Sequence, residues 1–254
     1  GMCMVSCPFG AISDKSQIFQ LAHALKEGKQ IIAEVAPAFV GQFGADVTPR
    51  KLRAALQELG FTEVYEVALG ADIGAVAEAH HYADKVVTKE LPFLLTSCCP
   101  SWSMMAKKFF PDMIENISQE LTPMVATART IKKEYPNAKV VFIGPCASKK
   151  LEASRTVAGG VASAVDACLK AYYPEVEVHI EHAEGLAECK KILTQAKAGK
   201  LNGCLIEGMG CPGGCMAGAG TNAPLTKAAA ELKKYQKAST NQLPSKELAE
   251  IQLD

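Results

Sequence analysis

Residues 139–146 read KVVFIGPC, a run of apolar and β-branched residues that ends on a glycine, a proline and a cysteine. Val, Ile and Phe in so short a run predict a buried strand over 139–143. Two other segments are built in the same way: PFLLTSCCP at 92–100 and CLIEGMGCPGGC at 204–215. Each predicted strand leads directly into cysteine, proline and glycine, and this repeated arrangement decides the fold and points to the site.

Strand and helix patterns alternate outward from these segments, from residue 14 onward. Further strands are predicted at 31–36, 62–68 and 175–181, and helices at 14–28, 49–59, 72–87, 102–110, 125–135, 159–173, 186–199, 224–238 and 245–253. Thr48 and Pro49 suit the N-cap and the first position of a helix. Strands separated by helices pair in parallel, with helices on both faces. We therefore expect an α/β fold with two lobes of mainly parallel sheets flanked by helices. The active site should lie between the lobes at the carboxyl ends of the strands.

Composition and charge exclude several classes of protein. The chain has 254 residues, of which 48% are hydrophobic and 21% charged, a normal globular balance. Its 27 Lys and Arg equal its 27 Asp and Glu, so charge indicates neither a nucleic-acid partner nor a membrane surface. No apolar run is long enough to cross a bilayer and no signal peptide opens the sequence, so a cytoplasmic location is expected.

The ten cysteines form two groups. Cys168, Cys189 and Cys204 stand among apolar or helical residues and are expected to be buried thiols. The others lie in short motifs with glycine or proline, and they are Cys3, Cys7, Cys98, Cys99, Cys146, Cys211 and Cys215. A disulfide framework is the alternative, but such frameworks belong to short secreted domains with small cores.

Four thiolates from Cys99, Cys146, Cys211 and Cys215 would make a soft, all-sulfur site. Softness favours an iron–sulfur cluster, zinc or Cu(I). Structural zinc usually uses paired C-x-x-C knuckles, which this sequence lacks, so an iron–sulfur cluster fits better. Unligated core cysteines are the alternative, and the CPGGC loop counts against it. Cys98 points away from its neighbour and would remain a thiol able to donate and accept a proton.

Two places in the sequence look incomplete. The opening GMCMVSCPFGAI is similar to the second half of a ferredoxin motif, C-x-x-C-x-x-C-x-x-x-C-P. Cys3 and Cys7 would be its third and fourth cysteines, so residues 1–13 are expected to be a remnant of a ferredoxin-like [4Fe–4S] domain ahead of a second domain at 14–254. Separately, SKKLEASR runs into TVAGGVAS without a turn signal, which predicts a missing stretch near 155–156.

Three segments together resemble the signature motifs of [FeFe]-hydrogenases: TSCCPSW (96–102), GPCASKKLE (144–152) and EGMGCPGGCMAGAG (207–220). Their order and their positions after strands match as well. The resemblance implies reversible oxidation of H2 to protons and electrons at an H-cluster. This cofactor is a [4Fe–4S] cluster joined through a cysteine sulfur to a di-iron unit that carries CO, cyanide and azadithiolate. It also implies ferredoxin or a redox partner subunit, additional upstream [4Fe–4S] clusters, and maturation proteins that insert the di-iron unit.

The resemblance assigns roles to residues of this chain. Cys99, Cys146, Cys211 and Cys215 would ligate the [4Fe–4S] cluster, with Cys215 bridging to the di-iron unit. Cys98 matches the thiol that relays protons, and Lys149 matches a lysine that binds a cyanide. Around the di-iron unit the matching positions are Ala36, Pro37, Ala38, Gly159, Gly160 and Met209. Glu78 and Ser118 match the continuation of the proton route by spacing, and Glu207 is another candidate relay. Each has an ordinary alternative, such as a solvated lysine or glutamate, a core methionine or a helix-starting glycine pair.

Some positions depart from the family pattern. His81 stands where many members have the second Glu of the proton route, and Lys85 where they have Arg. Gly144 replaces a common methionine, and Ala219 interrupts the glycine run after Cys215. These features resemble less-studied subclasses, some of which are proposed sensors of hydrogen. A sensory hydrogenase with slow turnover therefore stands beside the catalytic hypothesis. A non-catalytic iron–sulfur assembly protein is the third, and the extra relay thiol together with the lysine argues against it.

Overall fold

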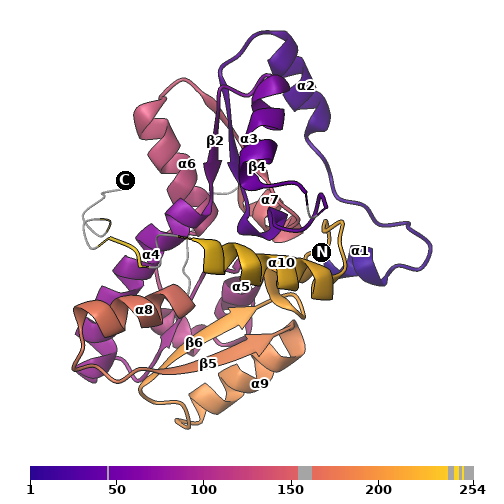
Figure 1. The fold of residues 1–254 in the computed structure, drawn as a ribbon. Coiled ribbons are helices and arrows are strands. Elements are labelled where there is room, and N and C mark those ends of the chain that lie inside the picture. Colours follow the sequence, from indigo (N-terminus) through magenta and orange to yellow (C-terminus); the bar gives the residue numbers. More distant parts are fainter. Residues whose placement is uncertain (45, 154–161, 240–242, 246–247, 249–254) are drawn as a thin grey trace.

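The computed structural model describes residues 1–44, 46–153, 162–239, 243–245 and 248. Within these residues the strands form two three-stranded sheets, and every pairing is parallel (Figure 1). The first sheet has the order β2 (Glu63–Glu66), β1 (Ile31–Val35), β4 (Lys139–Ile143). The second has the order β3 (Leu94–Leu95), β6 (Cys204–Met209), β5 (His179–Glu184). Each sheet forms, with its helices, one lobe: the first lobe contains β1 and the second contains β6. The expected α/β fold with two lobes of parallel sheets is confirmed.

Helices cover both faces of each sheet. The helices of the described residues are α1 (Met2–Ser6), α2 (Ile18–Lys26), the short η1 (Pro37–Phe39), α3 (Pro49–Glu58), α4 (Ala68–His81) running into the π-helix η2 (Tyr82–Val87), α5 (Pro100–Phe109), η3 (Pro111–Asn116), α6 (Pro123–Glu134), α7 (Ala147–Ala153), α8 (Ala162–Tyr172), α9 (Leu186–Lys197), η4 (Gly214–Ala217) and α10 (Leu225–Ala238). Thr48 caps α3 as expected, because its hydroxyl accepts a hydrogen bond from the Lys51 amide.

The core follows the alternation of strand side chains. In the first lobe Ile31, Ala33 and Val35 of β1 pack with residues of α2, α3 and α10, whereas Ile32 packs with α6 on the other face. In the second lobe Ile206 of β6 packs under α5 and α9, and its neighbour Leu205 packs against α4 and α8. Burial of both faces explains why these strands read as continuous apolar runs.

Three details differ from expectation. The strand at 139–143 is present as β4, but Lys139 is exposed and the rest is only partly buried, because β4 lies at an edge of its sheet and β1 occupies the centre. β5 begins four residues later than predicted, at His179. The helix expected over 14–28 is confined to α2. Most of the predicted helix 245–253 lies outside the described residues.

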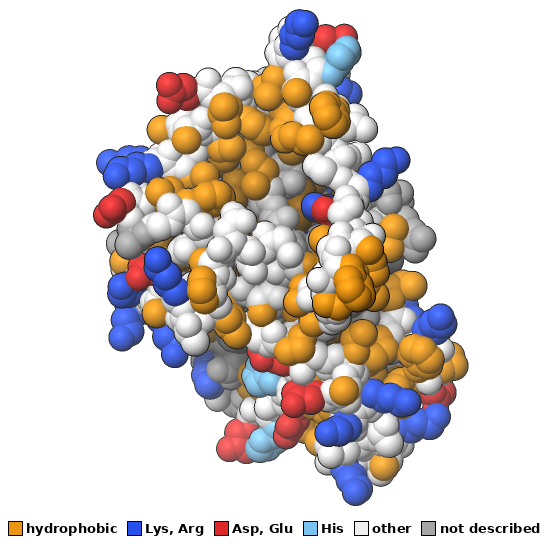
Figure 2. Space-filling model, turned by 90° about the vertical axis from the view of Figure 1, so that its right-hand side faces the viewer, with side chains coloured by type: hydrophobic (Ala, Val, Ile, Leu, Met, Phe, Trp, Pro, Cys, Tyr) orange, Lys and Arg blue, Asp and Glu red, His pale blue; other side chains and the backbone are white. Residues whose placement is uncertain are grey.

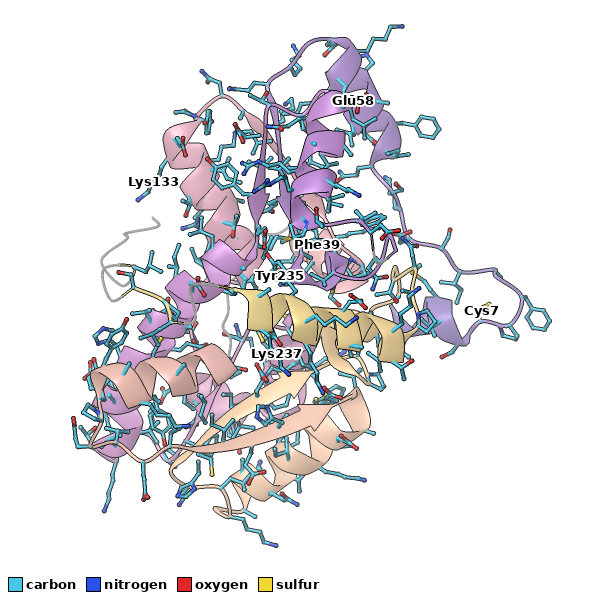
Figure 3. The ribbon with its side chains drawn as sticks, viewed as in Figure 1. Cys7, Phe39, Glu58, Lys133, Tyr235 and Lys237 are labelled. Carbon is cyan, nitrogen blue, oxygen red and sulfur yellow. The ribbon has the colours of Figure 1, made fainter. Side chains whose placement is uncertain are left out.

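Helix α10 connects the first lobe to the cysteine loop of the second. Figure 1 shows it crossing between the two sheets, and Figure 3 shows Tyr235 on this helix close to Phe39. The two rings meet edge to face at 6.3 Å, and the Tyr235 hydroxyl donates to the Glu66 carboxylate at 2.9 Å. At the other end of the helix, Leu225 packs so closely on Gly213 that a Cβ there would lie 2.5 Å from its Cδ2.

Candidate metal centre

The three cysteine segments meet where their strands end. Cys99 follows β3 and is the N-cap of α5, Cys146 follows β4 and precedes α7, and Cys211 and Cys215 follow β6. Cys146 therefore comes from the first lobe and the other three from the second. The helices behind them touch, because the hydroxyls of Ser101 on α5 and Ser148 on α7 form a hydrogen bond across the lobes.

The four thiols are electrostatic neighbours. The pKa of Cys215 is raised to about 12, mainly by desolvation and also by the charges of Cys99, Cys146 and Cys211, while Lys149 opposes the shift. By its surface area Cys215 is nevertheless exposed, so its sulfur lies at the edge of the protein body. Burial is also the main cause that raises the pKa of Cys211, and the charges of Cys146 and Cys99 raise it as well. Thiolates brought close together repel one another unless cations compensate them. The structure thus brings together the four cysteines that the sequence grouped.

The CPGGC loop folds back on itself through two left-handed residues. Gly213 has φ 84° and Gly214 φ 65°, a region that only glycine enters without strain. The Gly213 amide donates to the Glu184 carboxylate at 3.0 Å, which holds the loop against the end of β5. Cys215 lies in η4 directly after this turn.

Cys99 receives a hydrogen bond from a backbone amide. The donor is Gly210, whose nitrogen lies 3.2 Å from the Cys99 sulfur. A side chain at this position would collide with α5, because a Cβ would lie 2.7 Å from the Ser101 Cβ. Amide hydrogen bonds to cysteine sulfurs are one of the ways in which proteins tune iron–sulfur clusters.

Cys98 and Lys149 lie together beside this group. The Cys98 thiol is buried, and burial followed by the Glu207 charge holds its pKa well above the usual value. The Lys149 ammonium donates to the Cys98 carbonyl at 3.1 Å and lies 3.8 Å from the Glu152 carboxylate. With only 9% of its surface exposed, Lys149 is not a solvated surface lysine.

The residues of the expected proton route are buried near Cys98. Glu78 on α4 is fully buried, and its charge contributes to the raised pKa of Cys98. The Ser118 hydroxyl accepts from the Glu120 amide at 3.3 Å, and its carbonyl accepts from the Ser97 hydroxyl at 2.7 Å. Glu207 approaches more closely, with Oε1 4.0 Å from the Cys98 sulfur.

Of the other residues expected around the di-iron unit, the structure describes four, which lie at the ends of β1 and β6. Ala36 and Ala38 are buried at the end of β1 around the exposed Pro37, and Met209 ends β6. Gly159, Gly160 and the suspected missing stretch near 155–156 lie outside the described residues.

Cys3 and Cys7 do not join the four-cysteine group. Both belong to the N-terminal segment, and Figure 3 shows Cys7 standing away from the body of the protein. Hydrogen bonds from backbone amides, that of Phe9 first, lower the pKa of the Cys7 thiol.

The donor set fits a cluster better than a single ion. Among the described residues no three His, Cys, Asp or Glu side chains converge tightly enough to share one metal ion. The ligands of a [4Fe–4S] cluster each bind a different iron, so their sulfurs surround the cluster instead of meeting at a point. Four neighbouring thiols from the ends of three strands are compatible with that arrangement.

Sequence reasoning missed three titratable residues next to these groups. Glu34 in the middle of β1 is 3% exposed, and burial raises its pKa to about 8 while Lys149 opposes the shift. Burial likewise raises the pKa of Glu152. His182 on β5 forms a 3.1 Å contact with Glu207. A charged residue inside the apolar run IIAEVA was a visible signal for Glu34, whereas the His182 contact depends on strand register.

The protein thus has two parallel sheets, and its four neighbouring cysteines lie where strands of both sheets end. The family described as "Iron only hydrogenase large subunit, C-terminal domain" matches residues 29–172 and 169–219. The chain belongs to this iron-only hydrogenase family.

Curated relatives include two hydrogenases and an assembly factor. The chain is 34% identical over 166 residues to iron hydrogenase 1 of Clostridium pasteurianum, covering 58% of this chain and 29% of that protein. It is 32% identical over 178 residues to the NADP-reducing hydrogenase subunit HndD of Solidesulfovibrio fructosivorans, covering 61% and 30%. A cytosolic Fe-S cluster assembly factor NAR1 from Debaryomyces hansenii is 29% identical over 117 residues, covering 43% and 22%. The chain therefore spans less than a third of these relatives.

Solved structures share the fold. An apo [FeFe]-hydrogenase HydA1 from Chlamydomonas reinhardtii superposes with a TM-score of 0.72 at 20% identity, covering 86% of this chain and 88% of that one. The structure of HydA(deltaEFG), which concerns stepwise H-cluster assembly, gives 0.70 at 20% identity with the same coverage. None of the helices in the described part of the chain has the length and apolarity needed to cross a membrane.

Proposed function

We propose that this chain is the H-cluster domain of a hydrogenase that oxidises H2 reversibly to protons and electrons. The observation that carries the proposal is the meeting of Cys99, Cys146, Cys211 and Cys215 from three strand ends, with the spare thiol of Cys98 buried beside them. A non-catalytic iron–sulfur assembly protein would need the four ligands, but that role would leave the buried fifth thiol and the buried lysine without a function. Family membership supports the hydrogenase function.

The four cysteines would hold a [4Fe–4S] cluster, and Cys215 would also join it to a di-iron unit with CO, cyanide and azadithiolate. When bound, this cofactor supplies the splitting of H2 and the storage of its electrons. Lys149 is buried beside Cys98, and its ammonium would donate a charge-assisted hydrogen bond to an anionic ligand of the cofactor. Ala36, Pro37, Ala38, Gly159, Gly160 and Met209 are proposed to form the wall around the di-iron unit.

Protons would move through Cys98. Its thiol exchanges a proton with the cofactor side of the pocket, and Glu78 and Ser118 carry protons toward the surface. Burial of Cys98 and Glu78 supports this role, because both groups are shielded from bulk water and the pKa of the Cys98 thiol is strongly raised. Glu207 is a further relay beside the thiol.

Electrons would leave through the N-terminal segment. Residues 1–13 are proposed to be part of a ferredoxin-like domain in which Cys3 and Cys7 hold a further [4Fe–4S] cluster, ahead of the domain at 14–254. Gly1 packs against Ala147 and Ala219, next to the cysteine centre, so this segment starts beside the cluster ligands. Ferredoxin or a redox partner subunit would accept the electrons, maturation proteins would insert the di-iron unit, and the protein would act in the cytoplasm.

The proposal is tested by maturing the chain and measuring iron content, infrared bands of metal-bound CO and cyanide, and H2 turnover. We expect Cys211→Ser to lose cluster iron and Cys98→Ser to keep it while losing nearly all turnover. Cys168→Ala, which removes a buried thiol of α8 outside the site, is the control and should retain both. Absence of the infrared bands from the matured wild type would contradict the hydrogenase function and favour the assembly role.

A sensory role is the second candidate, and two positions favour it. Gly144 leaves no room for a larger side chain, because a Cβ would lie 2.4 Å from the Phe142 ring and 2.9 Å from the Ala36 Cβ. Burial, followed by the charge of Lys85, lowers the pKa of His81, so this residue carries a proton less readily near neutral pH. Slow turnover of a fully matured chain beside a fast relative would support sensing, and rapid turnover would rule it out.

A further inference from the structure

We propose that Glu207 and His182 form a second proton exit from Cys98, separate from the route through Glu78 and Ser118. The inference rests on the proposed function, since it extends the path of protons at the same site. It assigns a role to a histidine that stands in no recognisable ligand or family motif.

Two contacts form a continuous path from the buried thiol to the surface. Glu207 Oε1 lies 4.0 Å from the Cys98 sulfur, and Oε2 lies 3.1 Å from His182 Nδ1. Each carboxylate oxygen thus faces a different partner. The side chain of Glu207 is 14% exposed and that of His182 is 54% exposed, so burial decreases step by step from the thiol to the imidazole.

The sheet holds the Glu207–His182 pair in place. His182 of β5 and Glu207 of β6 are register partners in a parallel pairing, so their side chains leave the sheet on the same face. Strand β6 itself is fixed next to Glu207, because Gly208 packs on Trp102 so closely that a Cβ would lie 2.0 Å from the indole. The Trp102 Nε1 donates to the Thr96 carbonyl at 2.7 Å. The backbone of the second sheet therefore sets the relative position of the two residues.

Charges around His182 favour its protonated form. The hydrogen bond to Glu207 is the main cause that raises the pKa of His182; burial opposes it, and the charges of Glu207, Glu181 and Glu184 add to it. Figure 2 shows acidic and histidine side chains gathered at the lower end of the molecule, over the second lobe. Glu181, His182 and Glu184 are all exposed on β5. An imidazole among carboxylates at the surface is suited to exchange protons with water.

The transfer balances at each step. In H2 oxidation the S–H bond of Cys98 breaks and an O–H bond forms at Glu207 Oε1. Rotation of the carboxyl group then presents the proton to Nδ1 of the neutral His182 ring, whose own proton is on Nε2, and the imidazolium so formed releases the Nε2 proton to water. Exchange of the remaining proton from Nδ1 to Nε2 through solvent, which reaches this exposed ring, restores the starting tautomer. The thiolate would regain a proton from the cofactor side, where H2 is split, and uptake of protons from solvent follows the same steps in reverse.

The first test needs no cofactor. The titration of His182 is followed by NMR in the chain as isolated and in Glu207→Gln. We expect a lower pKa of His182 in the variant, because the amide removes the charge that favours the imidazolium. An unchanged titration would show that the two side chains do not interact, which would overturn the proposal.

The second test measures turnover of the matured protein in dilute buffer. We expect His182→Ala to lower turnover by about tenfold or more while iron content and infrared bands stay unchanged, and added imidazole to restore part of it. His179→Ala is the matched control, because His179 is also an exposed histidine of β5 but pairs with Cys204. Equal turnover in the two variants would overturn this inference alone. A wild-type chain without CO and cyanide bands would overturn the proposed function and this inference with it.

Discussion

Glu34 is the most unusual single residue of the first lobe, because a carboxyl group occupies the centre of a buried parallel strand. Its pKa is raised to about 8, mainly because burial disfavours the charged form, and the nearby Lys149 offsets only part of this effect. Glu152, which lies 3.8 Å from the same lysine, is also buried. One buried ammonium therefore interacts with two carboxyl groups, which limits how many of the three can be charged together.

Glu34→Gln should make folding less sensitive to pH. The ordinary pKa of the group is 4.5 and the folded value is about 8, so the folded state holds this proton more tightly than the unfolded chain. The contribution of Glu34 to folding is therefore most favourable below pH 4.5, declines as the pH rises toward 8, and is constant above that. We expect the free energy of unfolding of the isolated chain to fall less between pH 5 and pH 8.5 in the variant, by on the order of a few kcal/mol.

Urea unfolding at the two pH values measures this difference. Glu58→Gln is the control, since it removes an exposed carboxylate at the end of α3 by the same substitution. Parallel curves for the wild type and Glu34→Gln would show that Glu34 is charged in the folded protein over the whole range.

At the scale of elements, the crossing of α4 and α6 depends on a glycine. Gly70 lies in the first turn of α4, where an added Cβ would approach the Pro123 carbonyl oxygen to 2.1 Å. Its amide donates to the Thr127 hydroxyl at 3.0 Å. The two backbones can approach so closely only without a side chain between them. This packing matters for the site because α4 also carries Glu78.

Gly70→Ala and Gly74→Ala form a matched pair on this helix. We expect Gly70→Ala to lower the free energy of unfolding by about 1–3 kcal/mol or more, because the helices must separate. At Gly74 the nearest atom to an added Cβ is the Leu121 carbonyl oxygen at 3.9 Å, so alanine fits there. Gly74→Ala should be neutral or stabilising by less than about 1 kcal/mol through helix propensity. Thermal unfolding of both variants measures the contrast, and equal effects would contradict the close crossing.

The whole molecule is held together at the cysteine centre as well as by packing. Cys146 belongs to the first lobe, and Cys99, Cys211 and Cys215 to the second, while α10 and the Ser101–Ser148 contact bridge them. A cluster bound by all four thiols would link the lobes directly. Ligands that bind only the folded state stabilise it, so such a cluster should raise the stability of both lobes together.

Reconstitution with iron and sulfide should therefore raise the Tm of the chain, by about 4 °C or more if binding contributes several kcal/mol. Cys146→Ser removes the only proposed ligand of the first lobe, and most of the rise should be lost. Cys168→Ala keeps all four ligands and should show the full rise. Calorimetry before and after reconstitution is the measurement, and an undiminished rise in Cys146→Ser would show that the cluster does not join the lobes.

The sequence by itself determined the α/β class, the parallel sheets, the family and the cysteine motifs, because alternation, capping and cysteine spacing are local patterns written along the chain. The N-cap at Thr48 and the strand before Cys211 belong to this category. Only the tertiary structure decided that β4 is an edge strand, that Lys149 interacts with two buried carboxyl groups, and that His182 meets Glu207. These depend on strand order and register, which bring together residues far apart in sequence, and no local pattern encodes which strand lies next to which.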